Sequence, residues 1–145
     1  MAQQSCACGR PGTRDGSADI RVLVVDDHPM VRASLTELLS EEDAFTVVGE
    51  CEDGSQVVDA AAQLRPDVVC LDMSMPVMGG LAAAEALRAA QSDVRIILLT
   101  AESPARSTVA AVGADALVPK RARPDALLSC LRAVAAGATG CPYCL

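Results

Sequence analysis

The stretch VVCLDMSMPVMGG, residues 68–80, is the part of the chain that most directly indicates the fold. It begins with four apolar residues, a run typical of a strand that is buried on both faces. The run ends at Asp72, and Gly79 and Gly80 then precede an alanine-rich segment with helical periodicity. A buried strand, an acidic residue at its carboxyl end and a following helix together predict one βα unit.

The same unit recurs on both sides of this stretch. Strands are predicted over residues 20–25, 45–48, 68–71, 94–99 and 116–118. Each is followed by a predicted helix, the fourth over residues 104–112 and the fifth from Pro124 to Gly137. Alternating strands and helices favour a parallel sheet with right-handed crossovers and helices on both faces. The predicted fold class is therefore α/β, a flavodoxin-like (βα)5 three-layer sandwich with strand order 2-1-3-4-5.

Length and composition predict one domain and exclude several functional classes. The chain has 145 residues with a net charge of -7, one Phe, one Tyr and no Trp, which argues against binding to nucleic acids. No apolar run approaches about 18 residues, and residues 1–17 lack a signal-peptide core, so a cytoplasmic location is expected. The predicted organisation is a flexible leader over 1–19, a domain over 20–136 and a tail over 137–145.

Polar residues follow four of the predicted strands at their carboxyl ends. Asp26 and Asp27 follow the first strand and Asp72 the third, while Thr100 ends the fourth and Lys120 follows the fifth. In the order 2-1-3-4-5 these ends lie at one edge of the sheet, next to the point where the strand order reverses. Each residue alone has an ordinary structural explanation, such as a helix cap or a solvated lysine. Their shared location is what predicts a functional site.

The chemistry of this cluster predicts a magnesium-dependent phosphoryl-accepting site. Neighbouring carboxylates repel one another, and a hard divalent cation with oxygen ligands relieves that repulsion. One carboxylate can then act as a nucleophile while Mg²⁺ and Lys120 neutralise the transferring phosphoryl group. Thr100 can donate a hydrogen bond to a phosphoryl oxygen.

Four segments of the chain resemble the receiver domain of bacterial two-component response regulators. They are VVDDHP (24–29), LDMSMPVMGG (71–80), LTA (99–101) and Lys120. The second segment is the most specific, since it resembles the family's Asp-x-x-Met-Pro-x-x-x-Gly signature. The resemblance covers roughly residues 20–136. The Asp-Asp-His-Pro start and Pro124, four residues after Lys120, look most like the NarL-type subfamily.

The resemblance implies a role for each residue of the cluster. Asp72 would be the phosphoacceptor, and Asp27 and Asp72 would bind Mg²⁺ directly, with Asp26 acting through water. The backbone carbonyl of Ser74 would be a further ligand, Thr100 the switch hydroxyl and Lys120 the phosphate-contacting cation. His28 would not be a metal ligand. The implied partner is a histidine kinase, and self-dephosphorylation would be slow, so the chain is not expected to be an enzyme in any wider sense.

Three features depart from the family pattern. Leu117 stands where the family usually has an aromatic residue, three positions before the lysine. Pro119 lacks an N–H group, which should weaken the end of the fifth strand and is tolerable only near a sheet edge. The sequence ends at Leu145 without room for the helix-turn-helix domain of NarL-type proteins. We therefore expect a stand-alone receiver that signals through an unidentified protein partner, without membrane or direct DNA binding; homodimerisation is one option.

Three other functions compete with this interpretation. An aspartate-nucleophile phosphatase usually shows Asp-x-Asp, but Ser74 takes the second Asp position here. A transcriptional regulator truncated before its DNA-binding part is the second. The third is a redox- or metal-sensing module, in which Cys6, Cys8, Cys141 and Cys144 would bind Zn²⁺ or an iron–sulfur cluster. Cys51, Cys70 and Cys130 lie in apolar stretches and are predicted to be small core residues.

Overall fold

The described part of the chain is built around one five-stranded parallel sheet. A computed structural model describes residues 19–75, 77–90, 92–101 and 106–137. The strands are β1 (Ile20–Val25), β2 (Phe45–Cys51), β3 (Val68–Asp72), β4 (Arg95–Thr100) and β5 (Ala116–Pro119). Their order is β2-β1-β3-β4-β5, which confirms the predicted flavodoxin-like α/β fold.

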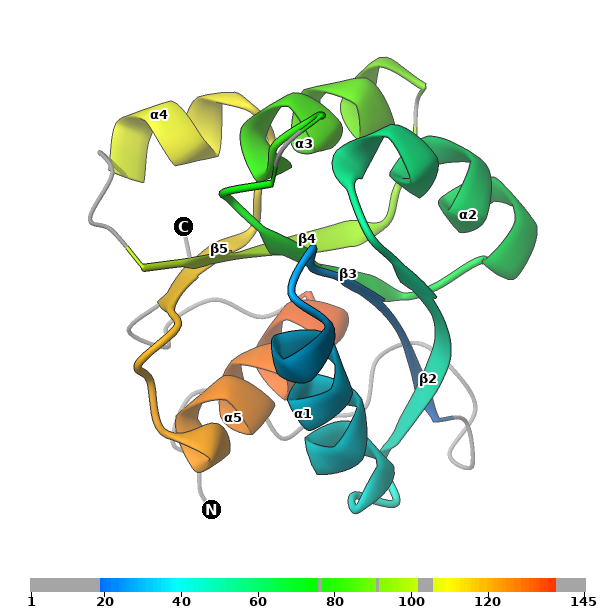
Figure 1. The fold of residues 1–145 in the computed structure, drawn as a ribbon, viewed down its shortest axis with the longest axis vertical. Coiled ribbons are helices and arrows are strands. Elements are labelled where there is room, and N and C mark those ends of the chain that lie inside the picture. The colour runs from blue at the N-terminus through cyan, green and yellow to red at the C-terminus, as the bar shows by residue number, and fades with distance from the viewer. Residues whose placement is uncertain (1–18, 76, 91, 102–105, 138–145) are drawn as a thin grey trace.

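Helices cover both faces of this sheet, as Figure 1 shows. One face carries α1 (Pro29–Ser40) and α5 (Pro124–Ala135), and the other carries α2 (Val57–Leu64), α3 (Gly80–Ala89) and α4 (Arg106–Ala111). A 3-10 turn, η2 (Gly54–Gln56), leads into α2. No helix in the described segments is long and apolar enough to span a bilayer.

Alternation of side chains along the strands divides the core into two layers. On β1, Val22 and Val24 pack with α1 and α5, whereas Leu23 and Val25 pack with α2 and α3. All four side chains are buried. Burying a side chain of this size stabilises the fold by about 1.5–3 kcal/mol, so the three inner strands β1, β3 and β4, which bury runs of such side chains, contribute strongly to stability.

The fourth and fifth βα units differ in part from the expectation. The helix α4 ends at Ala111, one residue before the end of the predicted 104–112, and residues 104 and 105 lie outside the described residues. Of its described side chains, Val109 is buried while Thr108, Ala110 and Ala111 are exposed. The sequence also predicts that β5 packs weakly, and this prediction is wrong. Residues Ala116, Leu117 and Val118 are all buried, because β5 alternates between the two core layers as the other strands do.

Pro119 is accommodated because β5 is the outermost strand. The strand continues through Pro119, which pairs with Thr100, and the next residue, Lys120, donates its N–H to the Thr100 carbonyl at 2.7 Å. Successive N–H groups of a strand point to opposite sides, so the missing N–H of Pro119 belongs to the outer side. The ladder between β4 and β5 therefore loses no hydrogen bond.

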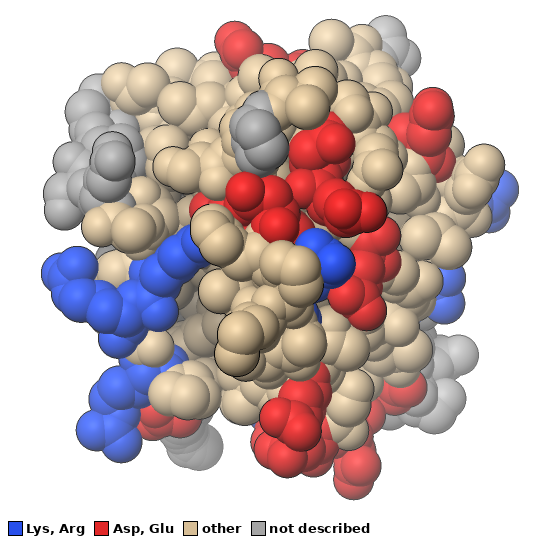
Figure 2. Space-filling view, in the orientation of Figure 1, with Lys and Arg blue, Asp and Glu red and all other residues tan. Residues whose placement is uncertain are grey.

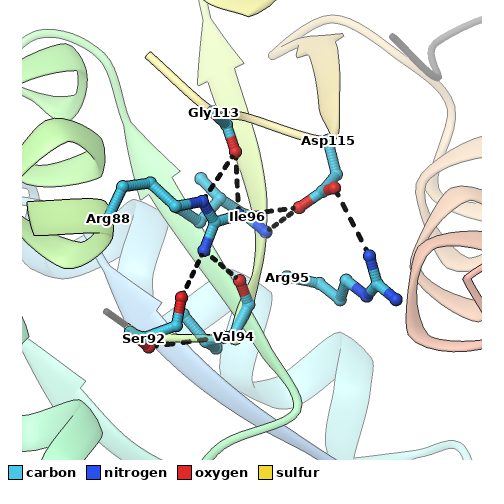
Figure 3. Close-up of polar contacts among 7 residues, drawn as sticks. All are labelled: Arg88, Ser92, Val94, Arg95, Ile96, Gly113 and Asp115. Carbon is cyan, nitrogen blue, oxygen red and sulfur yellow. Dashed lines mark hydrogen bonds and ion pairs between the residues drawn. The ribbon is translucent and has the colours of Figure 1, made fainter. Parts of the chain in front are cut away.

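A partly buried network of hydrogen bonds ties the amino ends of β4 and β5 to α3 (Figure 3). The Arg88 guanidinium donates to the carbonyls of Gly113, Ser92 and Val94, and Nη2 also contacts Asp115 Oδ2 at 3.2 Å. Gly113 has φ +86°, and a Cβ there would lie 2.8 Å from the Arg88 side chain. This network lies at the end of the sheet opposite the predicted functional site.

Candidate functional site

Side chains from three strands meet at the carboxyl edge of the sheet. Asp26 follows β1 and Asp72 ends β3, and both are buried. Lys120, which follows β5, places Nζ 3.1 Å from Asp72 Oδ1 and 3.4 Å from Asp26 Oδ2. Figure 2 shows the acidic side chains gathered near the middle of the face that Figure 1 presents. The structure thus brings together three of the residues that the sequence singled out.

The loops carrying the two buried carboxylates are fixed by backbone hydrogen bonds. The Asp26 N–H donates to the Cys51 carbonyl at 3.1 Å, and the Met73 N–H donates to the Leu99 carbonyl at 2.9 Å. The Gly80 N–H returns to the Met73 carbonyl at 3.1 Å, and a Cβ at Gly80 would lie 2.7 Å from the Asp72 carbonyl oxygen. Only glycine allows α3 to begin this close to the site.

The other predicted residues lie close to this centre. Asp27 is partly exposed, with one buried oxygen, Oδ1. Thr100 is buried at the end of β4. Ser74 is exposed, and its backbone N–H donates to Asp72 Oδ1 at 3.2 Å. A ligand role for the Ser74 carbonyl stays a prediction.

The surroundings raise the pKa values of both Asp72 and Lys120. Burial raises the pKa of Asp72, and the nearby charge of Asp26 adds to this, while hydrogen bonds from Lys120 and Ser74 oppose it. Burial alone would lower the pKa of Lys120, but the contacts with Asp72 and Asp26 outweigh burial and raise it. Asp72 is therefore a more basic carboxylate than an exposed one, beside an ammonium that stays charged.

Three carboxylate oxygens in this cluster point to a bound cation. Asp26 Oδ2, Asp27 Oδ1 and Asp72 Oδ2 are buried and accept no hydrogen bond, although Asp26 Oδ2 lies in ion-pair range of Lys120 and Asp27 Oδ1 lies in ion-pair range of His28. One ligand atom from each of Asp26, Asp27, His28 and Asp72 lies within 4.8 Å of the others. Buried carboxylate oxygens without donors cost free energy, and a hard divalent cation such as Mg²⁺ removes that cost. The residues present therefore fit Mg²⁺.

Two side chains of the site were not assigned to it from the sequence. His28 turns its Nδ1 toward Asp27 Oδ1, at 3.0 Å. Arg32, in the first turn of α1, donates from Nη1 to the Asp26 carbonyl at 2.6 Å and from Nε to Glu50 Oε1 at 3.0 Å. Nothing in the periodicity of α1 marks either residue, since both positions also fit a solvated helix start.

The three cysteines in the described part of the chain do not add to this site. Cys51, Cys70 and Cys130 are free and buried, as predicted, and burial raises the pKa of the Cys70 thiol to about 12. A thiol with so high a pKa is a poor nucleophile and metal ligand at neutral pH. The predicted zinc or iron–sulfur ligands Cys6, Cys8, Cys141 and Cys144 lie outside the described residues.

Comparison with known proteins gives one consistent result. Residues 22–132 match the family described as the response regulator receiver domain. The chain is 37% identical over 120 residues to the response regulator GacA of Pseudomonas viridiflava, covering 81% of this chain and 56% of that protein. It is also 37% identical over 118 residues to the nitrate/nitrite response regulator protein NarL of Escherichia coli K12, covering 80% of this chain and 55% of NarL. The match thus spans little more than half the length of these relatives.

Solved structures show the same fold. A LuxR-family two-component response regulator from Aurantimonas sp. SI85-9A1 superimposes with a TM-score of 0.78 at 28% identity, covering 83% of this chain and 87% of that one. The isolated REC domain of RcsB from Salmonella enterica serovar Typhimurium, solved with phosphomimetic BeF3-, gives a TM-score of 0.72 at 26% identity. Here the coverage is 80% of this chain and 88% of that one.

Proposed function

Because this chain belongs to the response regulator receiver domain family, we propose that it accepts a phosphoryl group on Asp72 from a histidine kinase. This proposal rests on the different contacts of the two Asp72 carboxylate oxygens. Oδ1 is held by Lys120 and the Ser74 N–H, whereas Oδ2 accepts no hydrogen bond. Oδ1 thus orients the carboxylate, and Oδ2 has two lone pairs without donors, one for the cation and one for a new bond.

The proposed step is a phosphoryl transfer from a phosphohistidine. A carboxylate oxygen of Asp72 attacks phosphorus, an O–P bond forms, and the N–P bond of the donor breaks. The electron pair of that bond stays on the imidazole nitrogen of the kinase. Lys120 would balance negative charge on the phosphoryl oxygens, and Thr100, which ends the neighbouring strand, would donate a hydrogen bond to one of them.

Mg²⁺ is the cofactor that the site favours. Asp27 and Asp72 would hold it, with Asp26 acting through water and the Ser74 carbonyl as a further ligand. When bound, the ion neutralises charge on the transferring group. Arg32 would help to position Asp26, because its guanidinium donates a hydrogen bond to the Asp26 backbone carbonyl.

The output is proposed to be a protein contact. A net charge of -7 offers no basic surface for the phosphates of DNA, so we do not expect these residues to contact DNA directly. Slow self-dephosphorylation is the only hydrolysis proposed. Stand-alone action, a cytoplasmic location and homodimerisation stay predictions, and the family match does not favour the redox alternative.

Mass spectrometry of the intact protein tests this function. After incubation with Mg²⁺ and acetyl phosphate, the wild type should gain one phosphoryl group, and chelation of Mg²⁺ should abolish the gain. Asp72→Asn should not be modified, whereas the control Asp59→Asn, which changes an exposed aspartate on α2, should behave like the wild type. Modification of Asp72→Asn at the wild-type rate would overturn the assignment.

A further inference from the structure

His28 places a nitrogen atom in the cluster formed with Asp26, Asp27 and Asp72, whose other potential metal ligands are carboxylate oxygens. Its Nδ1 lies 3.0 Å from Asp27 Oδ1 and 3.3 Å from Asp26 Oδ1. It is the only histidine of the chain. Asp26 turns its other oxygen, Oδ2, toward Lys120, so the imidazole and the ammonium meet different oxygens of the same carboxylate.

The separation of Nδ1 from Asp27 Oδ1 matches the spacing of neighbouring ligands around one metal ion. In an octahedral site with bonds of about 2.1 Å, adjacent ligand atoms lie about 3.0 Å apart. The distance of 3.0 Å from Nδ1 to Asp27 Oδ1 agrees with that value. A cation held by Asp27 could therefore also contact the imidazole with little movement of the side chains, while Asp26 acts through water.

The backbone keeps His28 in this position. Its N–H donates to Asp26 Oδ1 at 2.8 Å, and Pro29 directly after it begins α1 and limits the local backbone. The side chain is 62% exposed, so Nε2 can carry the ring proton toward water while Nδ1 offers its lone pair. An independent observation points to a cation here: Asp72 is almost fully buried, and its Oδ2 accepts no hydrogen bond.

Resting on the metal site of the proposed function, we infer that His28 is a ligand for Mn²⁺ and related transition ions and makes this site discriminate Mn²⁺ from Mg²⁺. Mg²⁺ takes oxygen ligands and keeps its waters, whereas transition ions accept imidazole readily. The ion that occupies the receiver then depends on the supply of transition metal as well as of Mg²⁺.

Pulsed electron paramagnetic resonance with Mn²⁺ tests the inference directly. A ¹⁴N coupling to bound Mn²⁺ reports a nitrogen ligand, and with a single histidine in a protein freed of any affinity tag, the side-chain signal belongs to His28. Mn²⁺ is preferred to Zn²⁺ as the probe because the cysteines would compete for Zn²⁺. Calorimetric titration with Mn²⁺ and with Mg²⁺ gives the selectivity.

The expected result is a ¹⁴N coupling in the wild type that His28→Gln abolishes. Affinity for Mn²⁺ should fall about tenfold in His28→Gln and His28→Ala, while affinity for Mg²⁺ changes less than about twofold. Asp27→Asn should weaken both ions. If Mn²⁺ binds without ¹⁴N coupling, or if both ions weaken equally in His28→Gln, the inference is wrong while the proposed Mg²⁺ site stands. If the wild type binds neither ion, the metal site of the proposed function fails as well.

Discussion

Lys120 and Asp72 form an ion pair of 3.1 Å across the sheet edge, although β4 lies between the strands that carry them. The long lysine side chain passes over the end of β4 to reach a buried carboxylate. Its contact with Asp26, at 3.4 Å, makes it the shared counter-ion of two buried acids. The stability of the site therefore depends on one partly exposed ammonium group.

Replacing this lysine should destabilise the fold and prevent phosphorylation. In Lys120→Met the free energy of unfolding should fall by about 2 kcal/mol at pH 7, because two buried carboxylates lose their counter-ion. Lys120→Arg should retain most of the stability, since it keeps the charge. Urea unfolding followed by circular dichroism measures this, as the chain has no Trp. The raised pKa of Lys120 also predicts that wild-type stability falls as pH rises beyond 10.5. Full stability in Lys120→Met would contradict the prediction.

Asp72→Asn should be more stable than the wild type at neutral pH. The pKa of Asp72 is raised above 3.8, so the folded state binds the proton more tightly than the unfolded state does. Ionisation of Asp72 thus costs stability, and the cost appears as pH rises through the raised pKa. The variant should gain about 1 kcal/mol at pH 7 and nothing below pH 3.8, where both states are protonated. Equal stability of the two proteins at pH 7 would show that Lys120 fully offsets the burial of this carboxylate.

Gly80→Ala should damage the site through the backbone. The added Cβ would lie 2.7 Å from the Asp72 carbonyl oxygen, a contact that neither backbone segment can relieve without moving. We expect a loss of about 2 kcal/mol in the free energy of unfolding and slower phosphorylation by acetyl phosphate. Ala82→Ser on the exposed side of α3 is the control and should change stability by less than about 0.5 kcal/mol. Unchanged phosphorylation in Gly80→Ala would show that α3 can shift freely.

Arg88 should be irreplaceable by lysine. Its guanidinium serves the carbonyls of Gly113, Ser92 and Val94 together, which a single ammonium cannot do. Arg88→Lys and Arg88→Ala should each lower the free energy of unfolding by about 2–3 kcal/mol, because partly buried carbonyls lose their donors. Hydrogen exchange should increase at Ile96, whose N–H donates to Asp115 Oδ2 beside Arg88. Wild-type stability in Arg88→Lys would mean that the charge alone matters.

Phosphorylation is expected to change the dynamics of α4. Among its described side chains only Val109 is buried, and low burial makes an element locally mobile. Beryllofluoride with Mg²⁺ should therefore alter hydrogen exchange across residues 106–119, by a shift between states already populated. Val109→Ala should raise exchange in α4 without any phosphate mimic. Identical exchange with and without beryllofluoride would refute this expectation.

The fold and the location of the site were predictable because parallel strands share one carboxyl edge. Once the strands are placed, Asp26, Asp72 and Lys120 must lie near one another. The exact ends of the strands could not be predicted from hydrophobic periodicity alone. The strand predicted over 45–48 continues to Cys51, because pairing of Gly49 and Glu50 with β1 outweighs their poor strand propensity.

Hydrogen bonds between side chains and groups far away in the sequence could not be predicted from the sequence. Arg88 finds its acceptors at Gly113, 25 positions away, and Arg32 finds Glu50, 18 positions away. Such contacts depend on the packing of α3 and α1 against the sheet. The direction of the His28 ring is likewise a choice of rotamer, which no pattern of residue types reports. The packing of β5 was underestimated because residues 107–113, just before it, are mostly small; the burial of β5 follows instead from its alternation between the two core layers.

Pro119 has a further consequence for the behaviour of this protein at high concentration. The outer strand of a sheet exposes N–H and C=O groups that can pair with a strand from another molecule, which starts aggregation. On the outer side of β5, which is short, Pro119 removes one of these donors. At the opposite edge, β2 has seven residues and no proline. Unwanted strand addition between molecules should therefore begin along β2, and a proline on its outward-facing side is the substitution to improve solubility.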